Sequence, residues 1–96
     1  MNENIKSVRL SAGLRRVAGA KAIDVPTGPR TTARDLLRRL CEVNPPLGER
    51  ILTADGELAD GIMMIVGGRH IDFQQGLDTS IGAADDVMII PPLSGG

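Results

Sequence analysis

The sequence is poor in aromatic residues, cysteine and net charge, and each shortage excludes a class of protein. Phe73 is the only aromatic residue, so the core must be built from aliphatic side chains and methionine. Cys41 is the only cysteine and has no internal disulfide partner, which favours a reducing compartment. A net charge of -1 gives no field that would attract nucleic acid or an anionic membrane. We therefore expect a cytoplasmic protein that recognises other proteins by shape and binds neither nucleic acid nor membrane.

Long hydrophobic runs are also absent. The longest apolar run, residues 62–66, is far shorter than the roughly 20 residues that span a bilayer. The opening residues MNENIKSVRL lack the apolar stretch of a signal peptide. A length of 96 residues suits one domain and leaves little room for a large enclosed active site. We expect one small soluble domain.

The N-terminal half is predicted to contain two strands and one amphipathic helix. Apolar and polar residues alternate over residues 7–12, and a second short apolar run covers residues 22–25, with a loop at 13–19 between them. Thr32 and Asp35 have the spacing of a capping box, and leucines follow at helical steps until Pro45-Pro46. The helix is therefore expected between Thr32 and these prolines.

The C-terminal half is predicted to contain a packed excursion, a hairpin, a short turn or helix, and a last strand. These occupy residues 45–61, 62–73, 77–81 and 87–90, respectively. Residues 62–66 and 87–90 are continuously apolar, which predicts strands buried on both faces. Gly67-Gly68 supplies a tight turn into a strand at residues 70–73. The element order indicates an α+β fold, with a mixed sheet packed on one main helix; it leaves a β-grasp and a ferredoxin-like sheet open.

The last six residues are predicted to leave the domain as an extended tail. Pro91 and Pro92 cannot donate to a sheet ladder, so the domain should cover residues 1–90 and the tail residues 91–96. At about 3.1 Å per residue the tail reaches roughly 19 Å. Its partner-binding residues are expected to be Pro91, Pro92, Leu93, Ser94 and Gly95.

The tail ends in Gly95-Gly96, whose terminal carboxylate is the predicted reactive group. Without Cβ atoms, the two glycines can enter a narrow channel and bring the carboxylate close to another reactant. An ionised carboxylate is a poor electrophile, so it requires activation. Adenylation with Mg-ATP, followed by attack of a persulfide sulfur, would convert it to a thiocarboxylate. The alternative is an inert end, because chain termini are often small and idle.

Other residues capable of chemistry are given structural roles. Cys41 follows Leu37 and Leu40 at helical spacing and is assigned to the core. His70 has no ligand cluster around it in the sequence, so no metal site is predicted. Three arginines of the predicted helix are interpreted as its solvated face; they are Arg34, Arg38 and Arg39.

Four segments resemble the MoaD/ThiS-type sulfur carriers, especially the small subunits of molybdopterin synthase. Residues 77–81 and 85–96, the latter reading DDVMIIPPLSGG, resemble the end of these proteins. Residues 8–15 resemble their first strand and loop, and residues 65–69 resemble their central hairpin. The excursion at 45–61 is similar to the longer archaeal-type branch and to carriers that supply sulfur for cysteine synthesis. Ile90 stands where many relatives have an aromatic residue.

The resemblance implies a ubiquitin-like β-grasp and a sulfur carrier that is not a stand-alone enzyme. It implies Gly96 as the site of adenylation and of the thiocarboxylate, with Gly95 needed for entry. The implied partners are a ubiquitin-activating-type (E1-like) adenylyltransferase that uses Mg-ATP, a sulfurtransferase or persulfide donor, and a sulfur-accepting enzyme such as the molybdopterin synthase large subunit. No cofactor is expected on the chain itself. Molybdopterin synthesis is the expected pathway; cysteine, thiamine or tRNA thiolation, conjugation to target lysines, and a binding module with an inert tail stay as alternatives.

Overall fold

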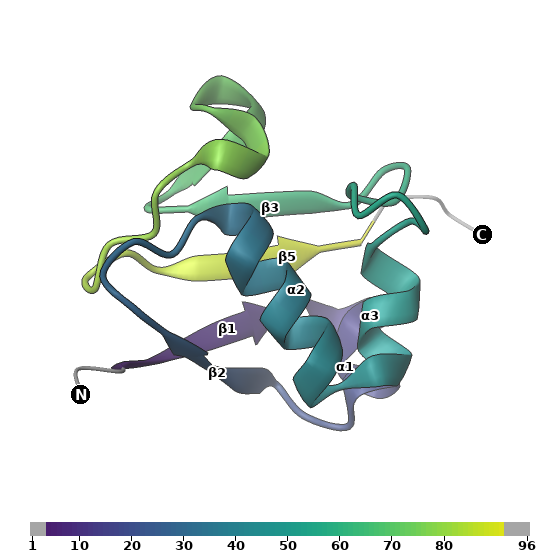
Figure 1. Cartoon of the computed structure of the whole chain (residues 1–96). Coiled ribbons are helices and arrows are strands. Elements are labelled where there is room, and N and C mark those ends of the chain that lie inside the picture. The colour runs from purple at the N-terminus through teal and green to yellow at the C-terminus, as the bar shows by residue number, and fades with distance from the viewer. Residues whose placement is uncertain (1–3, 92–96) are drawn as a thin grey trace.

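The structure, a computed structural model, describes residues 4–91 and has one mixed sheet with helices on one of its faces (Figure 1). In chain order the elements are β1 (Asn4–Leu10), α1 (Ala12–Ala18), β2 (Ala22–Thr27), α2 (Ala33–Val43), α3 (Pro45–Ile51), β3 (Met63–Val66), β4 (Arg69–His70), the 3-10 helices η1 (Ile71–Phe73) and η2 (Gly76–Asp78), and β5 (Val87–Ile90). The sheet order is β2-β1-β5-β3-β4. Figure 1 shows α2 crossing this sheet, with α1 and α3 at one end of it.

The centre of the sheet decides between the two folds that the sequence leaves open. β1 and β5 lie side by side and run parallel, with Val8 beside Val87 and Leu10 beside Ile89. The pairs β1–β2, β3–β5 and β3–β4 are antiparallel. Two hairpin-like arms joined by a parallel central pair, with a helix packed across them, form the ubiquitin-like β-grasp. The predicted fold class is confirmed.

The main helix begins where its capping residues predict. The Thr32 hydroxyl accepts a hydrogen bond from the Asp35 backbone N–H at 3.2 Å, and the Asp35 carboxylate accepts one from the Thr32 N–H at 3.1 Å. The pKa of Asp35 is held below its ordinary value, mainly by the hydrogen bond from the Thr32 backbone N–H and secondly by the Thr32 side chain, because these bonds stabilise the charged carboxylate. Leu36, Leu37 and Leu40 lie on the sheet-facing side of α2 and are almost completely buried. Burial of these leucines therefore fixes α2 to the sheet.

Two local predictions are wrong. Residues 13–19 were expected to form a loop, but most of them form α1, which buries Leu14 and ends at Gly19 with a φ of 76°. The second hairpin strand was expected at residues 70–73 but stops at His70. There the His70 Nδ1 accepts a hydrogen bond from the Asp72 N–H at 2.9 Å and opens η1. A side chain that accepts a hydrogen bond from a nearby backbone N–H competes with the pairing of that N–H in a strand.

The excursion at 45–61 is packed, as expected, but its first part is a helix. Pro45 and Pro46 come just after the end of α2, and they also form the first two positions of α3. Proline is well tolerated in the first turn of a helix. Asn44 caps this second helix by accepting a hydrogen bond from the Leu47 N–H at 3.2 Å. Leu47 and Ile51 are fully buried, and Leu52 pairs with Leu58 across the turn that follows. The excursion therefore extends the core.

Candidate functional site

The base of the tail is fixed at the end of the central strand β5. The Ile89 carbonyl accepts a hydrogen bond from the Ser11 N–H at 3.2 Å, and Ile90 pairs with Met63. Pro91 is half-buried beside the first turn of α1, where a Cβ added to Gly13 would lie 3.3 Å from its Cγ. The chain thus leaves the sheet from a defined position.

Of the six predicted tail residues, the structure places only Pro91. The other five, Pro92, Leu93, Ser94, Gly95 and Gly96, lie outside the described residues. β5 ends at Ile90, immediately before the predicted boundary between domain and tail.

Four apolar side chains form a patch on the open face of the sheet, next to the base of the tail. The cross-strand pairs Met63–Ile90 and Ile65–Met88 place all four on one face, and each is half-buried. We call these four residues the apolar patch. The other residues of the two strands point into the core and are buried: Met64, Val66, Val87 and Ile89.

This arrangement corrects the prediction that β3 and β5 are buried on both faces. Within residues 4–91 the helices lie on one face of the sheet, so alternate residues of each strand are only half-buried and accessible to a partner. Sequence reasoning missed the apolar patch. The available signal was the continuous apolar run in each strand, which also occurs where one face of a strand binds another protein.

A buried lysine secures the loop that enters β5. Lys6 is 8% exposed on the core face of β1, and its ammonium donates to the backbone carbonyls of Gly82, Ala83 and Asp85 at 3.0, 2.9 and 2.7 Å. The Asp85 carboxylate accepts from the Gly82 N–H at 2.7 Å and closes the same loop. This role was also missed, although Lys6 occupies the inward position of the alternation that continues through Val8 and Leu10.

Cys41 is half-buried and lies outside the main core, contrary to its predicted place there. It packs α2 against α3, where a Cβ added to Gly48 would lie 2.7 Å from both Cβ and Sγ of Cys41. Burial raises the pKa of the thiol, and the charge of Glu42 adds to this effect. The thiol is therefore protonated at neutral pH and is a weak nucleophile.

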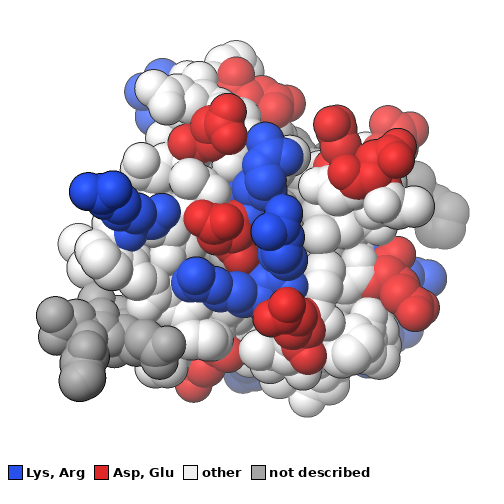
Figure 2. Space-filling model, viewed as in Figure 1, with Lys and Arg blue, Asp and Glu red and all other residues white. Residues whose placement is uncertain are grey.

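The predicted helix arginines are divided between the surface and structural contacts. Figure 2 shows basic side chains in a band across the face that carries α2, with acidic side chains among them. Arg34 forms an exposed ion pair with Asp78 at 3.3 Å, and Arg38 is exposed. Arg39 is half-buried and donates to the Pro26 carbonyl at 3.1 Å. Arg34 and Arg38 therefore belong to a solvated face, as predicted, whereas Arg39 has a structural role.

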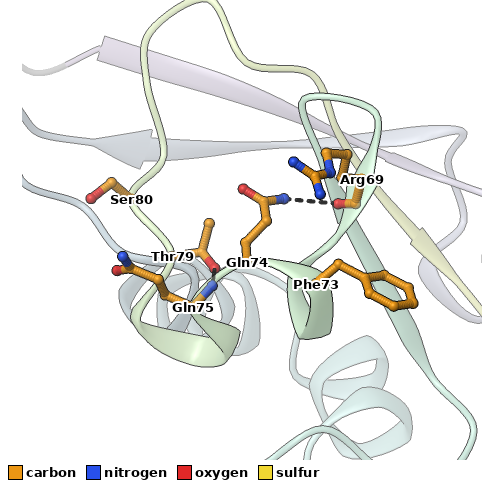
Figure 3. A pocket seen from close by; sticks show the side chains of 6 residues that line it. All are labelled: Arg69, Phe73, Gln74, Gln75, Thr79 and Ser80. Carbon is orange, nitrogen blue, oxygen red and sulfur yellow. Dashed lines mark hydrogen bonds between the residues drawn. The ribbon is translucent and has the colours of Figure 1, made fainter.

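A shallow hollow of about 440 Å³ lies beside η1 and η2 (Figure 3). Its lining residues are Arg69, Phe73, Gln74, Gln75, Thr79 and Ser80. Gln74 is held by hydrogen bonds from its amide to the carbonyls of Val66 and Arg69, both at 3.0 Å. Val66 pairs with Val87 at the start of β5, so the hollow lies at the opposite end of the sheet from the tail base.

Two further features bear on function. Among residues 4–91, no group of three or more His, Cys, Asp or Glu side chains is placed to hold a metal ion. None of the helices in this part of the chain is long and apolar enough to cross a membrane.

The fold agrees with comparisons to known proteins. A model of the ThiS family matches residues 8–96. The chain belongs to the ThiS family. It is similar to a candidate sulfur carrier protein of Archaeoglobus fulgidus, with 34% identity over 93% of this chain and 96% of that protein.

It is also similar to small archaeal modifier protein 1 of Haloferax volcanii, with 33% identity over 92% of this chain and 97% of that protein. A crystal structure of small archaeal modifier protein 1 from the same organism superposes with a TM-score of 0.84 at 31% identity, covering 97% of this chain and all of that one. This ThiS-family chain is therefore a sulfur carrier or ubiquitin-like modifier and not a stand-alone enzyme.

Proposed function

We propose that this ThiS-family chain carries sulfur as a thiocarboxylate on Gly96 and delivers it in biosynthesis, with molybdopterin as the product. The observation that supports this most directly is the position of the tail base. Pro91 leaves the end of the central strand beside the apolar patch, so one partner can cover the patch while the tail enters its active site. Burial of the patch supplies affinity, and the glycines leave the carboxylate accessible.

The chemistry has three balanced steps. The Gly96 carboxylate attacks ATP, which gives an acyl-adenylate and releases pyrophosphate. A persulfide of a sulfurtransferase then attacks the acyl carbon, AMP departs with the electron pair of the broken C–O bond, and an acyl disulfide forms. A thiol of the partner reduces this disulfide, so that the thiocarboxylate stays on Gly96 and the oxidised sulfur stays on the partner.

In this proposal the chain contributes position and the partners contribute catalysis. An E1-like adenylyltransferase binds Mg-ATP, and a sulfur-accepting enzyme such as the molybdopterin synthase large subunit binds the second substrate. The chain itself holds no cofactor. Its contributions are the docking patch, the fixed point at Pro91 and a carboxylate without neighbouring Cβ atoms.

A second function is favoured by one observation. Two of the similar proteins are small archaeal modifier proteins, and they are 33% and 30% identical over more than nine tenths of this chain. We therefore also consider transfer of the activated Gly96 to lysines of other proteins. Both functions use the same activated terminus, and they differ in the nucleophile that attacks it.

Reconstitution tests the proposal. The purified chain, incubated with its host's activating enzyme, Mg-ATP and a persulfide donor, should gain sulfur in place of oxygen at Gly96. A matched variant with one alanine appended after Gly96 should gain none. Its terminal carboxylate lies one residue farther along the chain and belongs to a residue that has a Cβ. Failure of the unmodified chain to be adenylated or loaded would refute the proposal. Loading followed by transfer to the large subunit with its pterin substrate would support the molybdopterin route; loading without transfer would reject that route.

A further inference from the structure

Side-chain amines are scarce in this chain, and the scarcity has a chemical consequence. Of eleven basic residues only Lys6 and Lys21 are lysines; the others are arginines. A guanidinium stays protonated at any physiological pH and does not attack an acyl group. An activated C-terminus therefore meets at most two nucleophilic side-chain amines when it encounters this chain.

Lys6 is withdrawn from reaction by the fold. It is 8% exposed, and its ammonium donates to three backbone carbonyls of residues 82–85. An ammonium has three N–H donors, so all of them are used. To act as a nucleophile, Lys6 would have to lose these bonds, leave the core and give up a proton.

Lys21 has the opposite surroundings. It is exposed in the turn between α1 and β2, and its ammonium has no hydrogen bond or ion pair with any of residues 4–91. Its backbone carbonyl accepts a hydrogen bond from the Leu10 N–H at 2.9 Å. Leu10 in turn lies beside Ile89 of β5. Lys21 therefore stands at the same end of the sheet as the base of the tail.

The tail is long enough to bring Gly96 to this lysine. Lys21 is two strand spacings from Ile89, and at roughly 4.8 Å per spacing this is about 10 Å. The six residues from Pro91 to Gly96 reach roughly 19 Å when extended. The reacting groups are joined through one chain, which raises their effective concentration above that of a separate lysine.

We propose that Lys21 is the acceptor for the activated Gly96 carboxyl group of this protein, an inference that rests on the proposed activation of Gly96. The neutral ε-amine, after losing a proton to solvent, attacks the acyl-adenylate. A C–N bond forms, the C–O bond to AMP breaks, AMP leaves with the electron pair, and the amine gives its second proton to solvent. The product is an isopeptide, which closes a ring within one chain or links two copies.

The test omits the sulfur donor, so that the amine has no competing persulfide. The chain is incubated with its host's activating enzyme and Mg-ATP, and its intact mass and digested peptides are measured. A ring is lighter than the chain by one water, and a linked pair has twice the chain mass less one water. Either product, with the isopeptide mapped to Lys21, is the expected result.

Matched variants separate position from mere presence of a lysine. Lys21→Arg keeps the charge and should abolish the product. Adding Ala20→Lys to that variant should restore it, because residue 20 is exposed in the same turn. Adding Arg30→Lys instead should not restore the ring, because residue 30 is exposed beyond Thr27, which pairs with Asn4 at the opposite end of β1 from Leu10.

A parallel reaction with hydroxylamine separates the two proposals. Hydroxylamine traps the acyl-adenylate as a hydroxamate on Gly96. Hydroxamate without any link at Lys21, or a link at Lys6 or at the N-terminal amine in its place, would overturn the assignment to Lys21 and leave the carrier function standing. Absence of the hydroxamate as well would overturn both.

Discussion

Replacing Lys6 with methionine should destabilise the domain strongly, because it removes the only side-chain donor that three backbone carbonyls have among residues 4–91. Methionine keeps an unbranched apolar stem but removes the ammonium that bonds the carbonyls of Gly82, Ala83 and Asp85 at 2.7–3.0 Å. The Gly82 carbonyl keeps its hydrogen bond from the Asp85 N–H at 3.1 Å. A hydrogen bond to a charged group contributes about 1.5–3 kcal/mol. The three bonds share one charge, and water can replace part of them in this loop, so we expect a loss of about 2–4 kcal/mol in the free energy of unfolding.

Urea-induced unfolding followed by circular dichroism measures this loss. Tryptophan and tyrosine are absent, so intrinsic fluorescence gives no useful signal. In a domain of this size each kcal/mol lowers Tm by about 4–8 °C, so thermal unfolding should show a decrease of at least about 8 °C. Lys21→Met is the matched control and should change stability by less than about 0.5 kcal/mol, because Lys21 is exposed. Equal stability of the two variants would refute the role given to Lys6.

Three further changes test other contacts. Gly48→Ala should cost about 1–3 kcal/mol in urea unfolding, because the new Cβ would lie 2.7 Å from Cys41 atoms; unchanged stability would contradict this close packing of α2 and α3. The lowered pKa of Asp35 stabilises the fold above the unfolded pKa, and this stabilisation is lost as the pH falls through the folded pKa. Between about pH 5 and about pH 2 the Tm of Asp35→Asn should therefore fall less than the Tm of the wild type. An identical fall in both proteins would exclude the capping box with Thr32 as a source of this pH-dependent stability. Met88→Lys should raise the Kd for the activating enzyme by roughly tenfold or more while Tm stays within a few degrees, since Met88 lies on the open face of the sheet; unchanged binding would remove the apolar patch from the interface.

The parts of the fold with strong local signals could be predicted from the sequence. The capping box at Thr32 and Asp35 and the leucine spacing after it identified α2, because helix starts depend on neighbouring residues. The helix α1 was missed because Gly13 and Gly19 suggest a loop, whereas burial of Leu14 against the sheet outweighs that preference. The parallel β1–β5 pair depends on contacts between the two ends of the chain, which local pattern does not encode.

The reactive group of the site was predictable, and its docking surface was not. Two terminal glycines after Pro91-Pro92 indicate an accessible carboxylate by their composition alone. The apolar patch depends on which face of β3 and β5 the helices cover, and an apolar run such as residues 62–66 gives the same signal for one buried face or two. Lys6 was overlooked because its carbonyl partners lie more than 70 positions away in the sequence.

The most direct test of the carrier assignment is the state of Gly96 in protein purified from its own host with an untagged C-terminus. Intact mass and fragmentation of the C-terminal peptide would be measured, since oxidation of Cys41 or of any of the four methionines gives nearly the same mass change. The carrier assignment predicts a fraction of the protein with sulfur in place of oxygen at Gly96, and loss of that fraction when the activating enzyme is deleted. An unmodified carboxylate in all of the protein, also after incubation with Mg-ATP, a persulfide donor and the activating enzyme, would contradict it.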